Sequence, residues 1–249
     1  MHPAAQASPN HDSALLSPKD RLIVALDFPN AVETLEFTER IEQTCQWVKV
    51  GLELFVAEGP GIVAALTEQG FSVFLDLKLH DIPNTVAGAV RTATNAGARL
   101  LTLHAAGGPA MLGAAAEAAN GLTAAPKLLA VTVLTSMDLA QLKAIGVDRS
   151  AAEQVELLAR MASGAGIEGF VSSAEEVAAL RKAHPAATLV IPGIRPTGAE
   201  LGDQKRVATP AKALGLGADY LVVGRPITQA KDPIAVAQAI LKEMAEAIL

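Results

Sequence analysis

One segment of the chain reads Phe71-Ser72-Val73-Phe74-Leu75-Asp76-Leu77-Lys78-Leu79-His80-Asp81-Ile82-Pro83-Asn84-Thr85. Its first third is β-branched, aromatic and apolar, which is typical of a buried strand, and Pro83 suits the first turn of a following helix. Because side chains alternate along a strand, Asp76 and Lys78 should lie on one face and the neighbouring leucines on the other. Two opposite charges on one face of a buried strand are costly unless they are paired or used. We therefore predict an active site at this strand end, with Lys78 as its chemical centre.

Apolar runs of the same kind recur along the chain, and each is followed by a segment able to form a helix. The eight candidate strands are Arg21–Asp27, Gln46–Gly51, Phe71–Lys78, Arg99–His104, Lys127–Leu134, Gly169–Ser172, Thr188–Pro192 and Asp219–Gly224. Prolines mark five expected helix starts, at Pro29, Pro83, Pro109, Pro210 and Pro233. Thr209 and Asp232 directly precede two of these prolines, where helix N-caps belong.

Eight strand–helix repeats in a chain of 249 residues match a (β/α)8 barrel, a single-domain α/β fold. The competing architecture is an open, doubly wound sheet, but no Gly-rich dinucleotide-binding turn follows the first strand. Residues 1–17 are rich in Ala, Pro, Ser, His and Asn and show no periodicity, so we expect a disordered extension there. The predicted barrel domain therefore spans residues 18–249.

The composition narrows the classes of protein that this chain can belong to. Hydrophobic residues make up 51% of the chain and aromatic residues only 3%, which suits a helix-rich α/β protein better than an all-β sandwich. A net charge of −6 disfavours nucleic-acid binding, and we find neither a membrane-spanning run nor a signal peptide. Cys45 is the only cysteine, so we expect no disulfide and a small, buried apolar side chain. These features predict a soluble, cytoplasmic protein.

Catalytic residues of a (β/α)8 barrel lie at the carboxyl ends of its strands. Polar residues gather at these positions in the chain: Asp27, Lys49, Asp76, Lys78, Asp81, His104, Thr135, Arg195 and Arg225. No histidine belongs to a cluster with clear metal-ligand spacing, so we predict no metal site. The segment Gly193–Ala208 is long for a barrel loop without structure of its own, which indicates a lid over the site.

Seven short motifs follow one another along the chain. They are Ala25-Leu26-Asp27, Lys49-Val50-Gly51, Asp76 to Thr85, Leu134-Thr135-Ser136, Pro192-Gly193-Ile194-Arg195, Gly202-Asp203-Gln204-Lys205-Arg206-Val207 and Val223-Gly224-Arg225-Pro226. Each motif alone is weak evidence, but the set in this order is specific. Through these motifs the chain from Arg21 onward resembles the orotidine 5′-phosphate decarboxylase family, which makes UMP. The resemblance implies a barrel enzyme that works without metal or cofactor.

The resemblance implies a role for each residue around Lys78. In this family the lysine stabilises the carbanion left at C6 of the pyrimidine and then donates a proton to it. Asp76 and Asp81 would hold the amine charged and aimed, since nearby carboxylates favour the charged form. Asp81, Ile82 and Thr85 would reach into the neighbouring subunit's site, which requires a homodimer. From the residues alone, Asp81 is about as well explained as a helix cap.

The resemblance also implies that Asp27 and Lys49 hold the ribose hydroxyls and that Thr135 binds the pyrimidine. Taken singly, these residues have plainer explanations. An aspartate just before a proline is more often a loop or capping residue, a lone lysine is more often a solvated charge, and a threonine at a strand end is usually structural. Asp76 and Lys78 alone are also compatible with a structural ion pair of the barrel.

Phosphate binding is indicated by the end of the eighth strand, where barrels commonly bind this group. Gly224 closes that strand, and Arg225 offers planar, charge-assisted hydrogen bonds. The family closes a loop over the phosphate, and the corresponding loop here carries Arg195 and Gln204. All four residues are therefore candidates for substrate binding.

Two other functions compete with this interpretation. A magnesium-dependent sugar-phosphate decarboxylase or lyase of the same superfamily shares the Asp-x-Lys-x-x-Asp core, but the segments Asp81–Thr85 and Gly202–Val207 favour the nucleotide enzyme. A catalytically silent barrel that binds phosphate ligands is the alternative from another class. The sequence favours decarboxylation of orotidine 5′-monophosphate to UMP and CO2, by a carboxy-lyase with no nucleic-acid or membrane partner.

Overall fold

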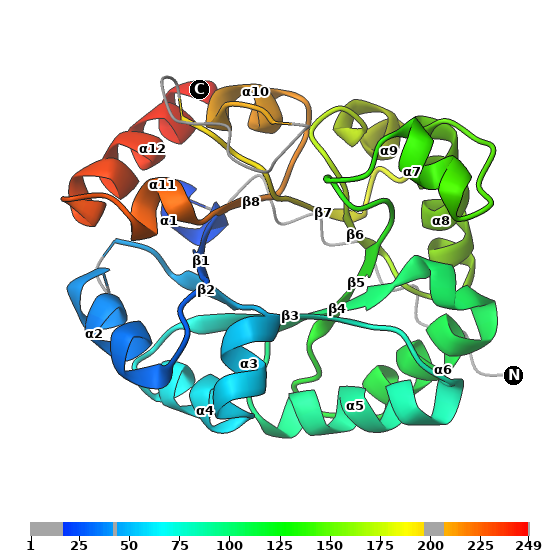
Figure 1. The fold of residues 1–249 in the computed structure, drawn as a ribbon, viewed down its shortest axis with the longest axis horizontal. Helices are drawn as coiled ribbons and strands as arrows, with labels where there is room; N and C mark the ends of the chain where they lie inside the picture. The colour runs from blue at the N-terminus through cyan, green and yellow to red at the C-terminus, as the bar shows by residue number, and fades with distance from the viewer. Residues whose placement is uncertain (1–16, 42–43, 197–206, 249) are drawn as a thin grey trace, which may run out of the picture.

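Eight parallel strands close into a barrel in which each strand pairs with its neighbours in chain order and β8 pairs with β1 (Figure 1). The computed structural model describes residues 17–41, 44–196 and 207–248. Its strands are β1 (Leu22–Leu26), β2 (Trp47–Val50), β3 (Ser72–Leu79), β4 (Leu100–His104), β5 (Lys127–Val131), β6 (Gly169–Val171), β7 (Thr188–Ile191) and β8 (Tyr220–Val223). The predicted barrel is thus confirmed. Only β5 differs from its predicted bounds by more than one residue, because it ends at Val131.

The strands are buried on both faces, since side chains fill the inside of the barrel and helices cover the outside. An interior cluster is formed by Ile23, Ala25, Phe74, Leu100, Leu129, Val190 and Val222. A larger cluster lies between the strands and the helices and takes the alternate residues, such as Val24 and Leu75. The barrel interior is therefore a packed core, and the site is left to the strand ends.

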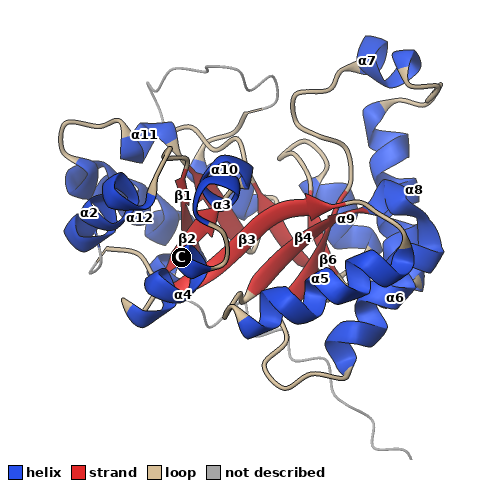
Figure 2. Ribbon diagram, turned by 60° about the horizontal axis from the view of Figure 1, so that its bottom comes forward, coloured by secondary structure: helices blue, strands red, loops and turns tan. Residues whose placement is uncertain are grey.

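Helices surround the barrel (Figure 1), and Figure 2 shows the same layers from the side, with α7 standing clear of the strands. They are α1 (Pro18–Arg21), α2 (Ala31–Ile41), α3 (Leu52–Glu58), α4 (Gly61–Glu68), α5 (Pro83–Asn95), α6 (Gly108–Asn120), α7 (Leu139–Ala144), α8 (Ala151–Gly164), α9 (Val177–Ala183), α10 (Pro210–Gly215), α11 (Arg225–Thr228) and α12 (Pro233–Ile248), with a 3-10 turn η2 (Ala105–Gly107). Among the described helices, none has the length and apolar character needed to cross a membrane.

Three of the predicted helix starts are confirmed in detail. Pro83, Pro210 and Pro233 are the first residues of α5, α10 and α12. The side chains of Thr209 and Asp232 each accept a backbone N–H from the first turn of the helix that follows. Proline suits this position because the first N–H groups of a helix have no partner within it.

Two other helix starts differ from the prediction. The prediction for Pro29 is wrong, because α2 begins two residues later, where Asn30 Oδ1 accepts the N–H of Glu33 and caps the helix. Pro109 is the second residue of α6 rather than the first. Ser17, the last residue of the expected extension, precedes α1 and donates to a carboxylate in its first turn. The rest of that extension lies outside the described residues.

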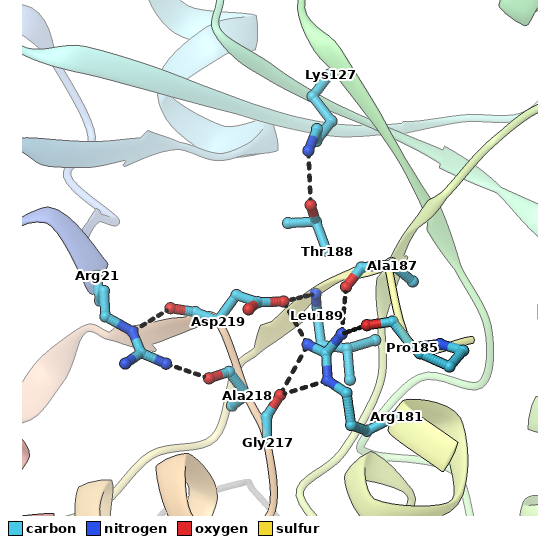
Figure 3. Close-up of polar contacts among 10 residues, drawn as sticks. All are labelled: Arg21, Lys127, Arg181, Pro185, Ala187, Thr188, Leu189, Gly217, Ala218 and Asp219. Atoms are coloured by element: carbon cyan, nitrogen blue, oxygen red, sulfur yellow. Dashed lines mark hydrogen bonds and ion pairs between the residues drawn. The ribbon is translucent and has the colours of Figure 1, made fainter. Parts of the chain in front are cut away.

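A polar network closes the amino-terminal end of the barrel under β7 and β8 (Figure 3). Asp219 Oδ2 accepts Arg181 Nη2 at 2.6 Å and the N–H of Leu189 at 2.7 Å. The Arg181 guanidinium also donates to the backbone carbonyls of Pro185, Ala187 and Gly217. Arg21 donates to the carbonyls of Ala218 and Asp219. Residues at this end of a barrel maintain the fold, which leaves the opposite end for chemistry.

Candidate active site

The charged residues of β3 lie where this strand leaves regular pairing with β4. The pairs on either side of the break are Phe74–Leu100, Leu75–Leu101 and Leu79–Leu103. Residues 76 to 78 of β3 therefore face residue 102 of β4 alone, which makes a β-bulge. Lys78 lies in this bulge with φ of 51°, a left-handed backbone conformation that is uncommon for residues other than glycine.

The predicted alternation along β3 is confirmed in spite of the bulge. Asp76 and Lys78 line a cavity at the carboxyl end of the barrel, as does Phe74 of the interior cluster. Leu77 and Leu79 turn the other way and contact the outer core. The strand thus presents both charges to the cavity.

Four charged side chains form a continuous row in which the sign alternates. Lys78 Nζ lies 2.9 Å from Asp76 Oδ1, and Lys49 Nζ lies 3.6 Å from Asp76 Oδ2 and 3.1 Å from Asp27 Oδ1. Asp76 and Lys49 are nearly buried, whereas 58% of the Asp27 side chain is exposed. Three strands, β1, β2 and β3, therefore bring together residues that are far apart in the sequence.

The charge of Asp76 is stabilised by its neighbours. Burial alone raises the pKa of Asp76, but the charges of Lys49 and Lys78, together with hydrogen bonds from Lys78 and Thr102, outweigh burial and hold this pKa below its ordinary value. Because the pKa is lower in the folded state, Asp76 stabilises the fold above its unfolded pKa of about 3.9, and this stabilisation is lost as the pH falls through the folded value. The two lysines of the row therefore favour the charged form of the Asp76 carboxyl group.

Thr102 joins this row, although it is not among the site residues predicted from the sequence. Its Oγ1 accepts the backbone N–H of Lys78 at 2.9 Å and donates to Asp76 Oδ1 at 2.9 Å. A signal was present in the sequence, because Thr102 is two residues before His104 and must share its inward face. A polar residue at an inward position of a barrel strand needs a partner.

The cavity above the row has a volume of about 470 Å³, which is enough for a small organic ligand. Predicted site residues that line it are Asp27, Lys49, Asp76, Lys78, Thr135, Arg195, Gly224 and Arg225. Its apolar wall comes from strands around the barrel and from the segment after β5: Ala25, Phe74, Val131, Val133, Leu134, Val171 and Val222. The lining of the cavity therefore combines charged side chains, which could bind a polar ligand group, with an apolar wall.

Two arginines meet at the side of the cavity formed by β7 and β8. Arg195 follows β7 and is 9% exposed, and Arg225 is the first residue of α11. Burial lowers the pKa of Arg195, and the positive charge of Arg225 lowers it further. Gly224 also lines the cavity here, and a Cβ at this position would make only ordinary contacts, at 3.4 Å from Ala25 Cβ and 3.5 Å from Asp27 Oδ2. Two guanidinium groups that face one cavity form a site suited to an anion such as phosphate.

The segment Asp81–Thr85 does not line the cavity within this chain. Asp81, Ile82 and Thr85 are all exposed. The capping interpretation of Asp81 is wrong, because Ile82 is the N-cap of α5 and Asp81 Oδ1 accepts the N–H of Ile82, at 2.6 Å, rather than one from the first turn of the helix. The remaining candidate, Gln204, lies outside the described residues. The ends of the predicted lid meet through a bond of 2.9 Å from the N–H of Arg195 to the carbonyl of Ala208.

Three further residues shape the site and were not selected from the sequence. Ser172 follows β6 and lines the cavity, and the rule of strand ends was sufficient to find it. Gln229 also lines the cavity, but it follows α11, and no pattern in the sequence marks it. Gly51 makes space for the row, since a Cβ there would lie 3.0 Å from Lys49 Nζ.

His80 and His104 lie near the row, but the described residues do not form a metal site with them. Within residues 17–41, 44–196 and 207–248, no group of three or more His, Cys, Asp or Glu side chains is arranged to hold a metal ion. The rings of His80 and His104 lie 5.5 Å apart. Burial lowers the pKa of His104, and the charges of His80 and Lys78 lower it further. His104 therefore favours its neutral form beside the charged row.

Proteins of similar sequence and structure are known. A family model described as "Orotidine 5'-phosphate decarboxylase / HUMPS family" matches residues 20–240. An orotidine 5′-phosphate decarboxylase of Anaeromyxobacter sp. (strain K) is 52% identical over 226 residues, which cover 90% of this chain and 98% of that protein. Another, from Moorella thermoacetica, is 49% identical over 91% of this chain and 92% of its own length.

A crystal structure of orotidine 5′-phosphate decarboxylase from Lactobacillus acidophilus superposes with a TM-score of 0.80 at 40% identity, covering 90% of this chain and 99% of that one. An uncharacterized conserved protein from Geobacillus kaustophilus gives a TM-score of 0.79, also at 40% identity and with the same coverage. The match in sequence extends over almost the whole barrel, including the charged row and both arginines. This chain belongs to the orotidine 5′-phosphate decarboxylase / HUMPS family.

Proposed function

We propose that this protein removes CO2 from orotidine 5′-monophosphate to give UMP and that it needs neither a metal nor a cofactor. The observation that carries the proposal is the row Asp27–Lys49–Asp76–Lys78 at the lining of a cavity that also holds two arginines. Relatives about half identical to this chain over most of its length are named orotidine 5′-phosphate decarboxylases. On this proposal the protein is a carboxy-lyase of pyrimidine biosynthesis.

Lys78 provides the central chemistry of the proposed reaction. Loss of CO2 from C6 of the pyrimidine leaves an electron pair in the ring plane, where no neighbouring carbonyl can delocalise it. An ammonium group fixed beside C6 stabilises this charge and then transfers its proton to the carbon. Asp76, 2.9 Å from Lys78 Nζ, keeps the amine charged and oriented before the reaction.

The remaining residues hold the substrate. Arg195 and Arg225 bind the phosphate, together with the backbone of Gly224 and with Gln204. Asp27 and Lys49 bind the ribose hydroxyls, and Thr135 binds the pyrimidine. Because the uncatalysed reaction is slow, the transition state needs stabilisation on the order of 20 kcal/mol, which a single lysine does not supply. Binding energy from the phosphate is therefore used to hold the ring against Lys78.

Assembly and location complete the proposal. The enzyme acts in the cytoplasm as a homodimer in which Asp81, Ile82 and Thr85 of each subunit reach the neighbouring site. All three are exposed in the single chain, which supports a partner at this position. Residues 1–17 precede the catalytic barrel of residues 18–249 as a disordered N-terminal extension.

The test is an ultraviolet assay of the purified protein with orotidine 5′-monophosphate in excess chelator. Loss of the substrate absorbance together with formation of UMP is the expected result. Turnover that depends on added Mg²⁺ with sugar phosphates, and no reaction with the nucleotide, would support the lyase instead. Binding of UMP without turnover would identify a silent binding protein.

A further inference from the structure

Because of the bulge in β3, the N–H of Lys78 is not part of the regular strand pairing. It donates a hydrogen bond to the side chain of Thr102 instead. Residues 76 to 78 face Thr102 alone across the two strands. Thr102 Oγ1 accepts the N–H of Lys78 at 2.9 Å. Thr102 is fully buried, so water does not replace this bond when the hydroxyl is removed.

The second bond of Thr102 leads back to the same lysine. Its hydroxyl donates to Asp76 Oδ1 at 2.9 Å, and this oxygen also accepts Lys78 Nζ at 2.9 Å. A hydroxyl has one donor and further acceptor capacity, and an ionised carboxylate can only accept, so the direction of each bond is fixed. The hydrogen bonds therefore form a closed ring. It runs from the backbone N–H of Lys78 through Thr102 and Asp76 back to the ammonium group of Lys78.

We propose that Thr102 is a positioning residue for the reaction, whose hydroxyl holds the left-handed backbone of Lys78 and the carboxylate of Asp76 in one arrangement and so aims the ammonium into the cavity. This inference rests on the proposed function for its effect on catalysis, whereas the arrangement itself is testable by structure. Thr102 does not line the cavity, so it acts through the two residues that do.

The geometry explains why a hydroxyl is needed at this position. Valine has nearly the shape of threonine, but it offers no acceptor to the Lys78 N–H and no donor to Asp76. The lysine backbone would then lose the contact that offsets its unusual conformation. Small displacements of a reacting group lower the rate much more than they lower substrate binding, because the transition state requires the closer fit.

The decisive variants are Thr102→Val, which removes the hydroxyl, and Thr102→Ser, which retains it. Thr38→Val is the matched control, since Thr38 is also fully buried and its hydroxyl bonds Leu35 and Gln69 in the outer layer. Thr102→Val should lower kcat roughly 10- to 100-fold with little change in KM, and Thr102→Ser should restore most of it. If Thr102→Val does not fold, Thr102→Ala takes its place.

The pH dependence of kcat distinguishes loss of the hydroxyl from a loss of packing, because a change in packing alone does not change it. Thr102 donates one of the hydrogen bonds that lower the pKa of Asp76. Removing it raises this pKa, so the decrease of kcat on the acid side should begin at a higher pH in Thr102→Val than in the wild type or Thr102→Ser. An unchanged kcat and acid limb in Thr102→Val would overturn the proposal, as would equal losses in Thr102→Val and Thr38→Val.

A crystal structure of Thr102→Val separates this inference from the proposed function. If the wild type does not decarboxylate the nucleotide, the proposed function fails, and the structure alone decides the role of Thr102. A changed φ at Lys78 or loss of its contact with Asp76 supports the positioning role. Retention of both would overturn it, whatever reaction the wild type performs.

Discussion

Lys78 has a backbone conformation that carries a cost. A left-handed φ costs an L-residue with a Cβ about 1–2 kcal/mol, and φ at Lys78 is 51°. Hydrogen bonds and ion pairs to Thr102 and Asp76 offset this cost. Strain of this kind is concentrated at reactive sites, where the surrounding structure fixes it. Here it accompanies the bulge that brings the ammonium to the cavity.

Lys78→Ala and Lys78→Gly both remove the ammonium, so both should abolish measurable turnover, a loss of roughly 10⁴-fold or more. Binding of UMP should remain measurable by calorimetry, because the arginines at the other side of the cavity are unchanged. Kinetic assays over a wide range of enzyme concentration test the loss. Substantial turnover in either variant would remove Lys78 as the proton donor.

The same two variants test the backbone. Glycine adopts a left-handed φ without penalty, so Lys78→Gly should be more stable than Lys78→Ala by about 1 kcal/mol in urea unfolding. The control is the same pair of substitutions at Lys49, which lies in the regular strand β2. At that position Lys49→Gly should be less stable than Lys49→Ala by about 0.5–1 kcal/mol. The same order of stability at both positions would contradict a strained Lys78.

Arg225→Ala tests the phosphate site. Loss of charge-assisted hydrogen bonds should lower kcat/KM for orotidine 5′-monophosphate roughly 10- to 100-fold or more. The effect should shrink on orotidine, which lacks the phosphate. Steady-state kinetics on both substrates give the comparison, with the exposed Arg160→Ala on α8 as a control. An equal loss on the two substrates would show that Arg225 does not bind phosphate.

Cys45 is predicted to be unreactive while the protein is folded. Its side chain is buried, and burial raises the pKa of the thiol to about 12. At pH 8 only roughly one molecule in 10⁴ carries the thiolate, so a thiol reagent should label the protein only after denaturation. Because the folded pKa is the higher one, this group destabilises the fold as the pH rises above about 8.5. Rapid labelling at pH 8 without denaturant would contradict the burial.

At the scale of the elements, β3 shows what the sequence could and could not predict. The alternation of Asp76 and Lys78 with leucines follows from the period of a strand, and it placed both charges correctly. The bulge is a property of two strands, since it depends on which residues of β4 lie opposite. No pattern within β3 alone reveals the bulge or the contact of Thr102 with Lys78, whereas the inward position of Thr102 on β4 did follow from the period of a strand.

The polar network at the amino-terminal ends of β7 and β8 should contribute to the stability of the fold without affecting catalysis. Asp219 is 4% exposed and bonds both Arg181 and the N–H of Leu189. Asp219→Asn leaves the partly buried Arg181 guanidinium without its buried carboxylate, so we expect a loss of about 3 kcal/mol in the free energy of unfolding. Urea unfolding measures this loss, and kcat of the folded variant should be unchanged.

An exposed ion pair provides the matched control for Asp219. Arg160 and Glu156 on α8 are 67% and 62% exposed, and Glu156→Gln should change stability by about 0–1 kcal/mol at most. Equal effects of the two substitutions would mean that burial does not strengthen the Arg181–Asp219 pair. A decrease in kcat for Asp219→Asn would mean that the two ends of the barrel are coupled.

At the scale of the whole molecule, the barrel was predictable because its repeats are local. Each strand and most helix starts follow from short patterns, and a parallel barrel then places all strand ends on one side. Side chains that enter the cavity from elsewhere did not follow from that rule. Gln229 is the example, because it comes from the segment after a short helix.

Large apolar side chains are exposed in the segment Asp81–Thr85 and on α3. Ile82 is 66% exposed, and Leu52 and Val56 of α3 are 53% and 80% exposed. Exposed apolar side chains are candidates for burial in a protein interface. On the proposed assembly a second copy covers Ile82 and receives the adjacent Asp81 and Thr85 near its own site.

This arrangement predicts that activity depends on assembly. Ile82→Glu places a charge in the interface, so it should weaken the dimer roughly tenfold or more in sedimentation experiments. Specific activity should then fall on dilution and recover at high protein concentration, since on the proposed assembly each site needs residues of its neighbour. Ile145→Glu is the control, because Ile145 is 67% exposed and follows α7 rather than preceding α5. A wild-type protein that is monomeric and fully active at low concentration would show that one chain forms the complete site.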